Sequence, residues 1–235
     1  MTVQEIVDEL KPLGSEGYRA ILLNHGIVDP IYGIKIEYMK KVEKRIKKDY
    51  QLALGLYDTG VYDMMYLAGL IADDEKMTRD DLQKWAETAK SSGIRENTVP
   101  WVAAGGRFGF EKAREWINSK DPDIAGIGWA TFGHLAALKN DDDLDMAELT
   151  SLLQRVKESI HEQPNRLKAM MNNFVIAVGS YVVELSPYAI DIGQSIGFVM
   201  IDRGKTACKT PFSPDCIRKV EKSGKLGVKR KTVKC

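Results

Sequence analysis

Apolar residues recur along this chain with the spacing of an α-helix. Residues 3–10 carry apolar side chains at positions i, i+3, i+4 and i+7, and a helical period also marks residues 149–160 and 167–182. This spacing places one side of each helix in a core. Sustained alternation with a period of two, the pattern of a half-buried strand, is absent from the sequence. The pattern therefore predicts an all-α protein.

Turn signals divide this pattern into helices of similar length. Breaks fall near Pro30, Gly60 and Pro122, among other positions. Two successive helices occupy roughly 35–45 residues, the size of a HEAT-type unit, in which antiparallel helix pairs stack on their neighbours. We therefore predict a HEAT-like α-solenoid as one domain over residues 1–202. An irregular helical bundle is the alternative, because periodicity identifies buried faces without fixing their stacking order.

Charge is unevenly distributed along the chain. The net charge is +1, yet residues 203–235 hold 11 Lys or Arg against 2 Asp or Glu. We treat these residues as a basic C-terminal extension. Such an asymmetry indicates an anionic partner, nucleic acid first, with a solubilising tail as the alternative. The tail residues expected to contact DNA include Lys229, Arg230 and Lys231.

A second basic surface lies in the segment YGIKIEYMKKVEKRIKK. One helical face of this segment is apolar, and the opposite face carries cations that include Lys40, Lys44 and Lys48. On the concave side of a solenoid, such a face would follow a phosphate backbone. Binding would weaken with added salt, because each neutralised phosphate releases counterions. We expect these three lysines to contact DNA.

Composition narrows the class of protein further. The chain is 44% hydrophobic and 29% charged, which is typical of a folded globular protein, and no apolar run is long enough to span a bilayer. The N-terminal sequence is acidic and amphipathic, unlike a signal peptide. Cys208, Cys216 and Cys235 form no CxxC pair, so we expect no metal site. A cytoplasmic protein without a membrane partner is the resulting expectation.

The stretch SGIRENTVPW combines a base, an acid and an amide at Arg95, Glu96 and Asn97, directly before Val99 and Pro100. Such a cluster can form a catalytic or phosphate-binding turn. Asn and Glu are also common in the solvated turn before a helix, where they cap backbone groups. Both interpretations remain open from the residues alone.

Four stretches together resemble the AlkD-like DNA alkylation repair family: YGIKIEYMKKVEKRIKK, YDTGVYDMMYLAGLIAD, SGIRENTVPWVAAGGRFG and SKDPDIAGIGWATFGHLAAL. The resemblance spans about residues 28–200, in the order that stacked helical repeats require. It implies a HEAT-like array that holds double-stranded DNA in a basic concave cleft. Active members of that family excise N3- or N7-alkylated purines by hydrolysing the N-glycosidic bond. The resemblance implies no metal and no organic cofactor.

Carried over residue by residue, the resemblance is incomplete at the catalytic positions. Glu96 falls at the family's catalytic aspartate, and Ser92 falls at an aromatic position. Trp129 falls at or near an arginine position. Ser180 falls near a second aromatic position, with Tyr181 beside it. The resemblance therefore identifies Glu96 as the candidate catalytic carboxylate, which would stabilise a cationic sugar as the base departs.

Several other residues are candidates for contact with DNA. Arg95 and the basic side chains would hold phosphates, and tryptophans would form an apolar wall. For each tryptophan, packing in the core is the competing interpretation. A hydrogen bond between helices is the competing interpretation for the two asparagines. The candidates outside the basic surfaces are Arg95, Asn97, Trp101, Arg107, Trp129, Asn172 and Asn173.

Three functions follow from these observations. The first is a DNA-binding protein of the alkylation repair type, for which glycosylase activity is left open. The second is a repeat protein that binds distorted or branched DNA without cleaving it, which Ser92 and Trp129 favour. The third is a protein-binding scaffold, because HEAT-type surfaces also bind peptides. A monomer is expected in each case.

Overall fold

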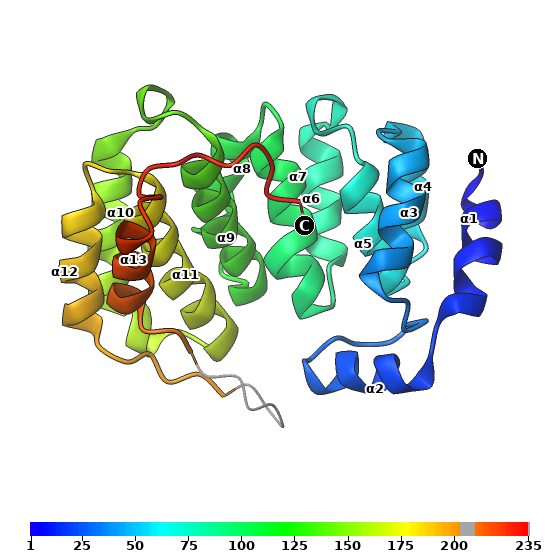
Figure 1. Cartoon of the computed structure of the whole chain (residues 1–235), viewed down its shortest axis with the longest axis horizontal. Helices are drawn as coiled ribbons and strands as arrows, with labels where there is room; N and C mark the ends of the chain where they lie inside the picture. The colour runs from blue at the N-terminus through cyan, green and yellow to red at the C-terminus, as the bar shows by residue number, and fades with distance from the viewer. Residues whose placement is uncertain (203–209, 235) are drawn as a thin grey trace. The chain divides into compact units, whose positions relative to one another are not determined.

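Helices joined by short turns make up the computed structural model of this chain, which describes residues 1–202 and 210–234 (Figure 1). Over these residues there is no β-strand, which confirms the all-α prediction. Contacts between residues gather in two compact units, described separately below. Unit 1 comprises residues 1–108 with Lys234, and unit 2 comprises residues 109–202 and 210–233.

Unit 1 is built from packed helix pairs. Helix α4 packs on α5, α6 packs on α7, and α3 and α7 also contact α5. Helix α5 is buried along its whole length, so it forms the centre of this unit. The helices of unit 1 are α1 (Val3–Leu10), α2 (Glu16–Asn24), α3 (Ile36–Ile46), α4 (Tyr50–Asp58), α5 (Tyr62–Ile71), α6 (Arg79–Thr88) and α7 (Val99–Gly105).

Unit 2 repeats this arrangement around α11. Helix α9 packs on α8 and on α11, while α10 contacts both α11 and α12. Helix α13 packs on α11 and α12, although its residues fall within the extension expected outside the helical array. The helices of unit 2 are α8 (Gly109–Trp116), α9 (Pro122–Leu138), α10 (Met146–Ser159), α11 (Asn165–Tyr181), α12 (Ser186–Ile196) and α13 (Ser213–Lys222).

A glycine sets the spacing between α8 and α9. A Cβ atom at Gly128 would lie 2.6 Å from the backbone nitrogen of Ile117 and 3.0 Å from the carbonyl oxygen of Ala113. Backbone atoms cannot move aside as a side chain can, so only glycine permits this close approach. The small residue beside Trp129 therefore serves helix packing within unit 2.

A buried carboxylate fixes the loop that leads into α3. Asp63 lies in the first turn of α5 and is fully buried. Its two oxygens accept hydrogen bonds of 2.7 Å from the backbone N–H groups of Tyr32 and Ile34. Burial raises the pKa of the Asp63 carboxyl, and the hydrogen bonds from Ile34 and Tyr32 oppose that rise. Asp63 thus positions the start of α3, the helix that carries the lysines.

No helix within residues 1–202 and 210–234 is both long and apolar enough to cross a membrane. The longest helices, α9 and α11, have 17 residues each. Both pack against other helices of unit 2.

Replacing Asp63 with asparagine is expected to lower the free energy of unfolding by about 2 kcal/mol. An amide NH2 would face one of the two backbone N–H groups, which leaves a buried donor without an acceptor. Urea denaturation followed by circular dichroism measures the change. The matched control is Glu75→Gln, at an exposed carboxylate of the same unit. Equal stability of D63N and the wild type would contradict the anchoring role of Asp63.

Candidate nucleic-acid interface

The stretch singled out in the sequence forms a π-helical turn, η3 (Ile94–Thr98), that continues directly into α7. Pro100 has no N–H, so the α-helical hydrogen bond from residue 100 back to the Glu96 carbonyl cannot form. A π-turn has wider hydrogen-bond spacing and is frequent at functional sites. The Val-Pro dipeptide thus gives this turn a local cause, and the turn carries Arg95, Glu96 and Asn97 together.

All three polar side chains of η3 are half-buried. The Arg95 guanidinium donates a 2.5 Å hydrogen bond from Nε to the carbonyl of Ala89, and Asn97 donates from Nδ2 to the carbonyl of Gly93 at 3.2 Å. The first bond ties Arg95 to the end of α6, and the second ties Asn97 to the start of its own turn. Glu96 is the one carboxylate of the turn, in the position expected for the candidate catalytic group.

Ser92, which the resemblance places at an aromatic position of the family, has a structural role. Its hydroxyl lies 3.3 Å from the carbonyl oxygens of His25 and Gly26. Ser91 beside it donates to the carbonyl of Val28 and accepts from the N–H of Val28. The two serines therefore fasten the loop after α2 to the segment before η3.

Aromatic side chains form a layer next to η3, but they are buried. Trp101 is 1% exposed and meets the ring of Tyr66 edge-on, with 5.4 Å between centroids. The ring centroids of Tyr66 and Tyr62 are 6.3 Å apart. The hydroxyl of Tyr62 would lie 2.7 Å from a Cβ atom at Gly93. Burial speaks against direct contact between Trp101 and DNA, and core packing accounts for this residue. The two tyrosines were not among the residues predicted from the sequence, although their spacing of four residues signals a shared face of one helix.

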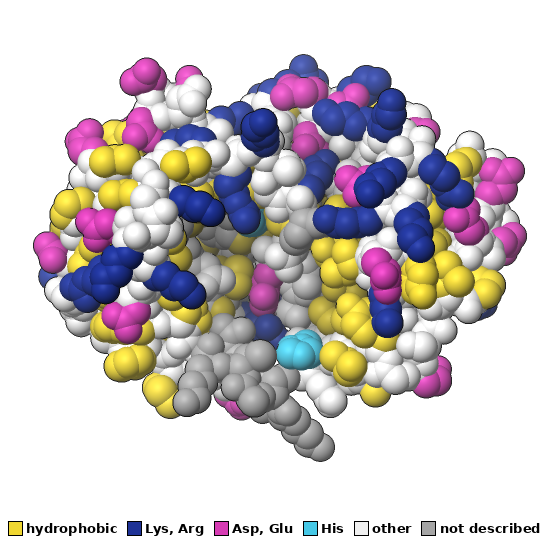
Figure 2. Space-filling model, viewed as in Figure 1, with side chains coloured by type: hydrophobic (Ala, Val, Ile, Leu, Met, Phe, Trp, Pro, Cys, Tyr) yellow, Lys and Arg dark blue, Asp and Glu magenta, His cyan; other side chains and the backbone are white. Residues whose placement is uncertain are grey.

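The lysines of α3 form the basic surface of unit 1. Lys44 and Lys48 are exposed and Lys40 is half-buried, while Met39 and Val42 face the core. The Nζ atom of Lys48 lies 3.7 Å from Oδ1 of Asp73. Among the described residues, Lys40, Lys41, Lys44 and Lys47 have no carboxylate within ion-pair distance. Figure 2 shows Lys and Arg side chains gathered over α3 and the helices next to it.

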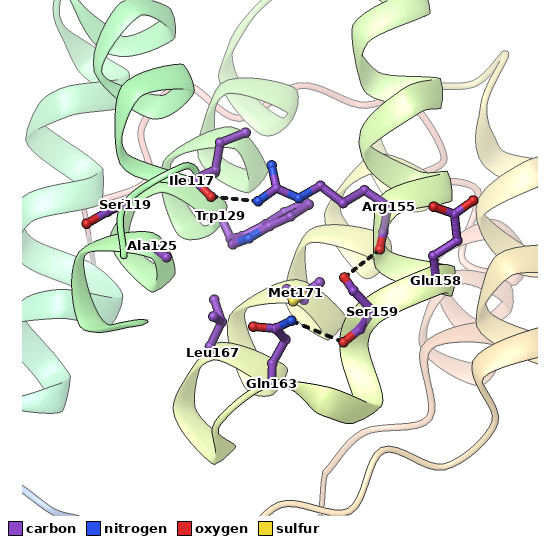
Figure 3. A pocket seen from close by; sticks show the side chains of 10 residues that line it. All are labelled: Ile117, Ser119, Ala125, Trp129, Arg155, Glu158, Ser159, Gln163, Leu167 and Met171. Atoms are coloured by element: carbon purple, nitrogen blue, oxygen red, sulfur yellow. Dashed lines mark hydrogen bonds between the residues drawn. The ribbon is translucent and has the colours of Figure 1, made fainter. Parts of the chain in front are cut away.

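Unit 2 contains a cavity of about 250 Å³ with Trp129 on its wall (Figure 3). Trp129 is nevertheless only 1% exposed, and the guanidinium of Arg155 lies 5.5 Å from its ring centroid. Arg155 itself donates to the carbonyl of Ile117 at 2.8 Å and to the side chain of Asn118 at 2.9 Å. Trp129 is therefore covered by a guanidinium from α10, and its expected contact with DNA finds no support in this burial.

The two asparagines of α11 have different surroundings. Asn172 is 1% exposed and donates a 3.0 Å hydrogen bond from Nδ2 to the carbonyl of Pro211. The bond joins α11 to the segment before α13, so Asn172 has a structural partner and lies away from the accessible surface. Asn173 is exposed. Asn173 thus remains the accessible amide of the pair.

The basic tail of unit 2 is bound to the ends of its own helices. Lys229 donates from Nζ to the carbonyl of Ala136 at 2.9 Å and lies 2.7 Å from Asp141. The N–H of Arg230 donates to the carbonyl of Ala137, and that of Gly227 donates to the carbonyl of Ser180. Carbonyls at helix C-termini lack partners in their own helix and carry partial negative charge, which cations stabilise.

The side chains of Arg230 and Lys231 are exposed. Residues 227–230 therefore form a cap on the C-terminal ends of α9 and α11. The expected contact of Lys229 with phosphate conflicts with its place in this cap. Arg230 and Lys231 keep side chains that an anion can reach.

Arg107, expected to reach a phosphate, is exposed next to Phe108 in unit 1. The structure thus brings Arg95, Glu96 and Asn97 together on η3, and it places Lys40 and Lys44 on α3 and Lys48 just after the end of that helix. Among the described residues, no group of three His, Cys, Asp or Glu side chains is arranged to hold a metal ion.

Replacing Lys229 with methionine is expected to lower the free energy of unfolding by about 2 kcal/mol, because charged hydrogen bonds to Ala136 and Asp141 are lost. Lys231→Met is the matched control: this lysine is exposed and bonds no described residue. Thermal and urea denaturation compare the two variants. A K229M protein as stable as K231M would show that the cap contributes nothing to stability.

Comparison with known proteins identifies the family. An uncharacterized protein of Listeria innocua serovar 6a is 29% identical over 228 residues, and one of Listeria monocytogenes serovar 1/2a is 28% identical over 228 residues. Each alignment covers 95% of this chain and 97% of the relative.

A solved structure from a new family of proteins related to the HEAT-like repeat DNA glycosylases, with affinity for branched DNA structures, is 31% identical. Its TM-score is 0.92, and both chains are covered completely. This likeness confirms the prediction of a HEAT-like repeat fold. Residues 6–186 match the family described as DNA alkylation repair enzyme. The chain therefore belongs to the DNA alkylation repair enzyme family, as its sequence motifs indicated.

Proposed function

We propose that this protein binds double-stranded DNA of the branched or distorted kind, as a monomer in the cytoplasm, and that binding rather than base excision is its main activity. The observation that carries the proposal is the lysine surface of α3 and its C-cap, where Lys40, Lys41, Lys44 and Lys47 have no carboxylate partner among the described residues. Release of counterions when such a surface contacts phosphates supplies a large share of its affinity for DNA. The solved relative with affinity for branched DNA supports the choice of DNA form.

The surroundings of η3 favour binding over catalysis. Excision of an alkylated purine needs a carboxylate beside the sugar and side chains that hold the lesion in place. Here Ser92 is hydrogen-bonded to the loop after α2, and Trp101 is in the core. Neither supplies an exposed aromatic face for a base or sugar. The carboxylate of Glu96 is the one group of the expected set that keeps its chemistry.

A glycosylase is the second candidate function, and the position of Glu96 favours it. A half-buried carboxylate on a π-turn has fewer waters around it than an exposed one, so its charge acts more strongly on a nearby cation. An N7-alkylated purine already carries positive charge, and the sugar becomes cationic as the base leaves. Glu96 would stabilise that sugar and orient the attacking water.

Substituting both Lys40 and Lys44 with glutamine is expected to weaken binding to a four-way DNA junction. If each lysine contacts one phosphate, the slope of log affinity against log salt concentration falls in magnitude by about 1.8. Fluorescence anisotropy over a series of NaCl concentrations measures the slope. The control is the double variant Lys90→Gln with Lys120→Gln, at two exposed lysines outside α3. A flat salt response of the wild type would favour a protein scaffold over a DNA-binding protein.

Release of N7-methylguanine from methylated duplex DNA tests the second candidate. We expect the wild type to release no more base than Glu96→Gln, which keeps the shape of the side chain and removes its charge. Chromatography of the free base under single-turnover conditions gives the rates. Release by the wild type that exceeds E96Q by 100-fold or more, about 2.7 kcal/mol of transition-state stabilisation, would establish the glycosylase instead.

A further inference from the structure

The cavity of unit 2 lies where four helices begin or end. Its walls come from the loop after α8, from α9, from the last turns of α10 and from the start of α11 (Figure 3). At about 30 Å³ per water molecule, its volume of about 250 Å³ corresponds to roughly eight waters, which is room for a small ring system. The apolar residues of the lining are Ile117, Ala125, Trp129, Leu167 and Met171.

A polar atom of this lining lacks a partner. Trp129 is 1% exposed, and its indole N–H donates to no acceptor among the described residues. The indole N–H of Trp85 likewise has no partner within the described chain, but it is closed off from solvent, whereas Trp129 lines the cavity. A buried tryptophan usually donates this hydrogen bond. A ligand with an acceptor atom would supply the missing partner.

Gln163 adds an acceptor to the same cavity. Its Nε2 donates to the carbonyl of Ser159 at 3.3 Å, which leaves Oε1 without a donor among the described residues. The hydroxyls of the lining already take part in hydrogen bonds. Ser159 donates to the carbonyl of Arg155 at 2.8 Å, and Ser119 accepts from the N–H of Asp121 at 3.1 Å. The indole N–H and the amide oxygen are thus a donor and an acceptor inside an apolar lining.

The charges of the lining already have partners in the protein. Arg155 donates to the carbonyl of Ile117 and to the side chain of Asn118. Glu158 is exposed at the rim and accepts a 2.7 Å hydrogen bond from Gln154. Charged residues that flank the lining in sequence nearly cancel: Lys120, Lys157, Arg166 and Lys168 against Asp121, Asp123 and Glu162. A neutral ligand therefore fits this site better than an anion or a zwitterion, whose charges would need partners of their own.

We propose that the cavity binds one neutral nucleobase, free or unpaired in a nucleic-acid strand, at a site beyond the phosphate contacts of the proposed function and independent of them. A nucleobase is flat, and its edges carry acceptor atoms and N–H donors. Its ring packs against the apolar lining, an acceptor atom takes the N–H of Trp129, and an N–H donates to Oε1 of Gln163. A sugar would leave many hydroxyls unpartnered in this lining, and a hydrocarbon would use neither polar group.

The first test uses free adenine and free uracil as probes. The indole N–H signal of Trp129 in the 15N-labelled full chain is followed by NMR during titration, with the signal of Trp85 in unit 1 as the internal control. We expect the Trp129 signal alone to shift and to saturate with a nucleobase, and to stay in place with ribose or sodium phosphate at equal concentration. No saturable shift with adenine or uracil, or an equal response to ribose, would overturn the site.

Variants of the lining test the two features that carry the proposal. Gln163→Leu removes the acceptor and should weaken adenine binding by about tenfold. Ala125→Leu fills part of the cavity without removing a polar group and should abolish the shift. The matched control is Gln194→Leu, at an exposed glutamine of α12 in the same unit, which should bind adenine like the wild type. Wild-type affinity in Q163L would overturn the site, and this result decides the question even where A125L does not fold.

Competition identifies the source of the base. A duplex with one unpaired adenine is added to adenine-loaded protein, and the same duplex without the unpaired base is the control. Release of adenine by the first duplex alone assigns the site to a base in a strand, and retention with both assigns it to a free base. Equal release by both would place adenine on a DNA-binding surface and overturn the cavity site. DNA binding by the wild type without any adenine binding would leave the proposed function standing and remove this inference alone.

Discussion

The carboxylate of Asp63 is the interaction on which the basic surface of unit 1 depends. It is buried in the central helix α5 and accepts hydrogen bonds from the loop that leads into α3. Without an acceptor, the N–H groups of Tyr32 and Ile34 would be partly or fully buried with no partner, which is costly for a folded protein. The orientation of α3, and with it the direction in which its lysines point, follows from this one anchor. The placement of a basic surface is here specified by a residue that is itself buried.

Positive charge serves two different purposes in this molecule. On α3, Lys40, Lys41 and Lys44 stand without carboxylate partners among the residues described, whereas Arg45 of the same helix pairs with Glu9. In the tail, Lys229 of unit 2 and Lys234 of unit 1 bind carbonyls at helix ends and nearby aspartates. Composition treats both groups alike, because it counts charges without their partners. The two groups of lysines can be told apart only from the structure, which shows the partners of each side chain.

The helices and their HEAT-like pairing were predictable from the sequence, because burial of one helical face leaves a regular apolar period. The polar turn at residues 95–97 was also predictable, since a break before Val99-Pro100 interrupts that period. The roles of Trp101 and Trp129 were not. In the sequence, a tryptophan of the core cannot be told from one in a binding cleft. Only the neighbours Tyr66 and Arg155 show that both rings are covered.

The π-turn before Pro100 has a consequence for how this family can diverge. A π-turn accommodates one residue more than an α-helical turn, so it rotates everything that precedes it relative to α7. An insertion or deletion at this point changes which side chain faces outward while Trp101 keeps its place in the core. A change of length at this one point can therefore alter which residue faces outward, and with it the chemical group that the turn presents. If two relatives are aligned by counting back from Pro100 with α-helical periodicity, the residues matched in this way will then not occupy the same position in their structures.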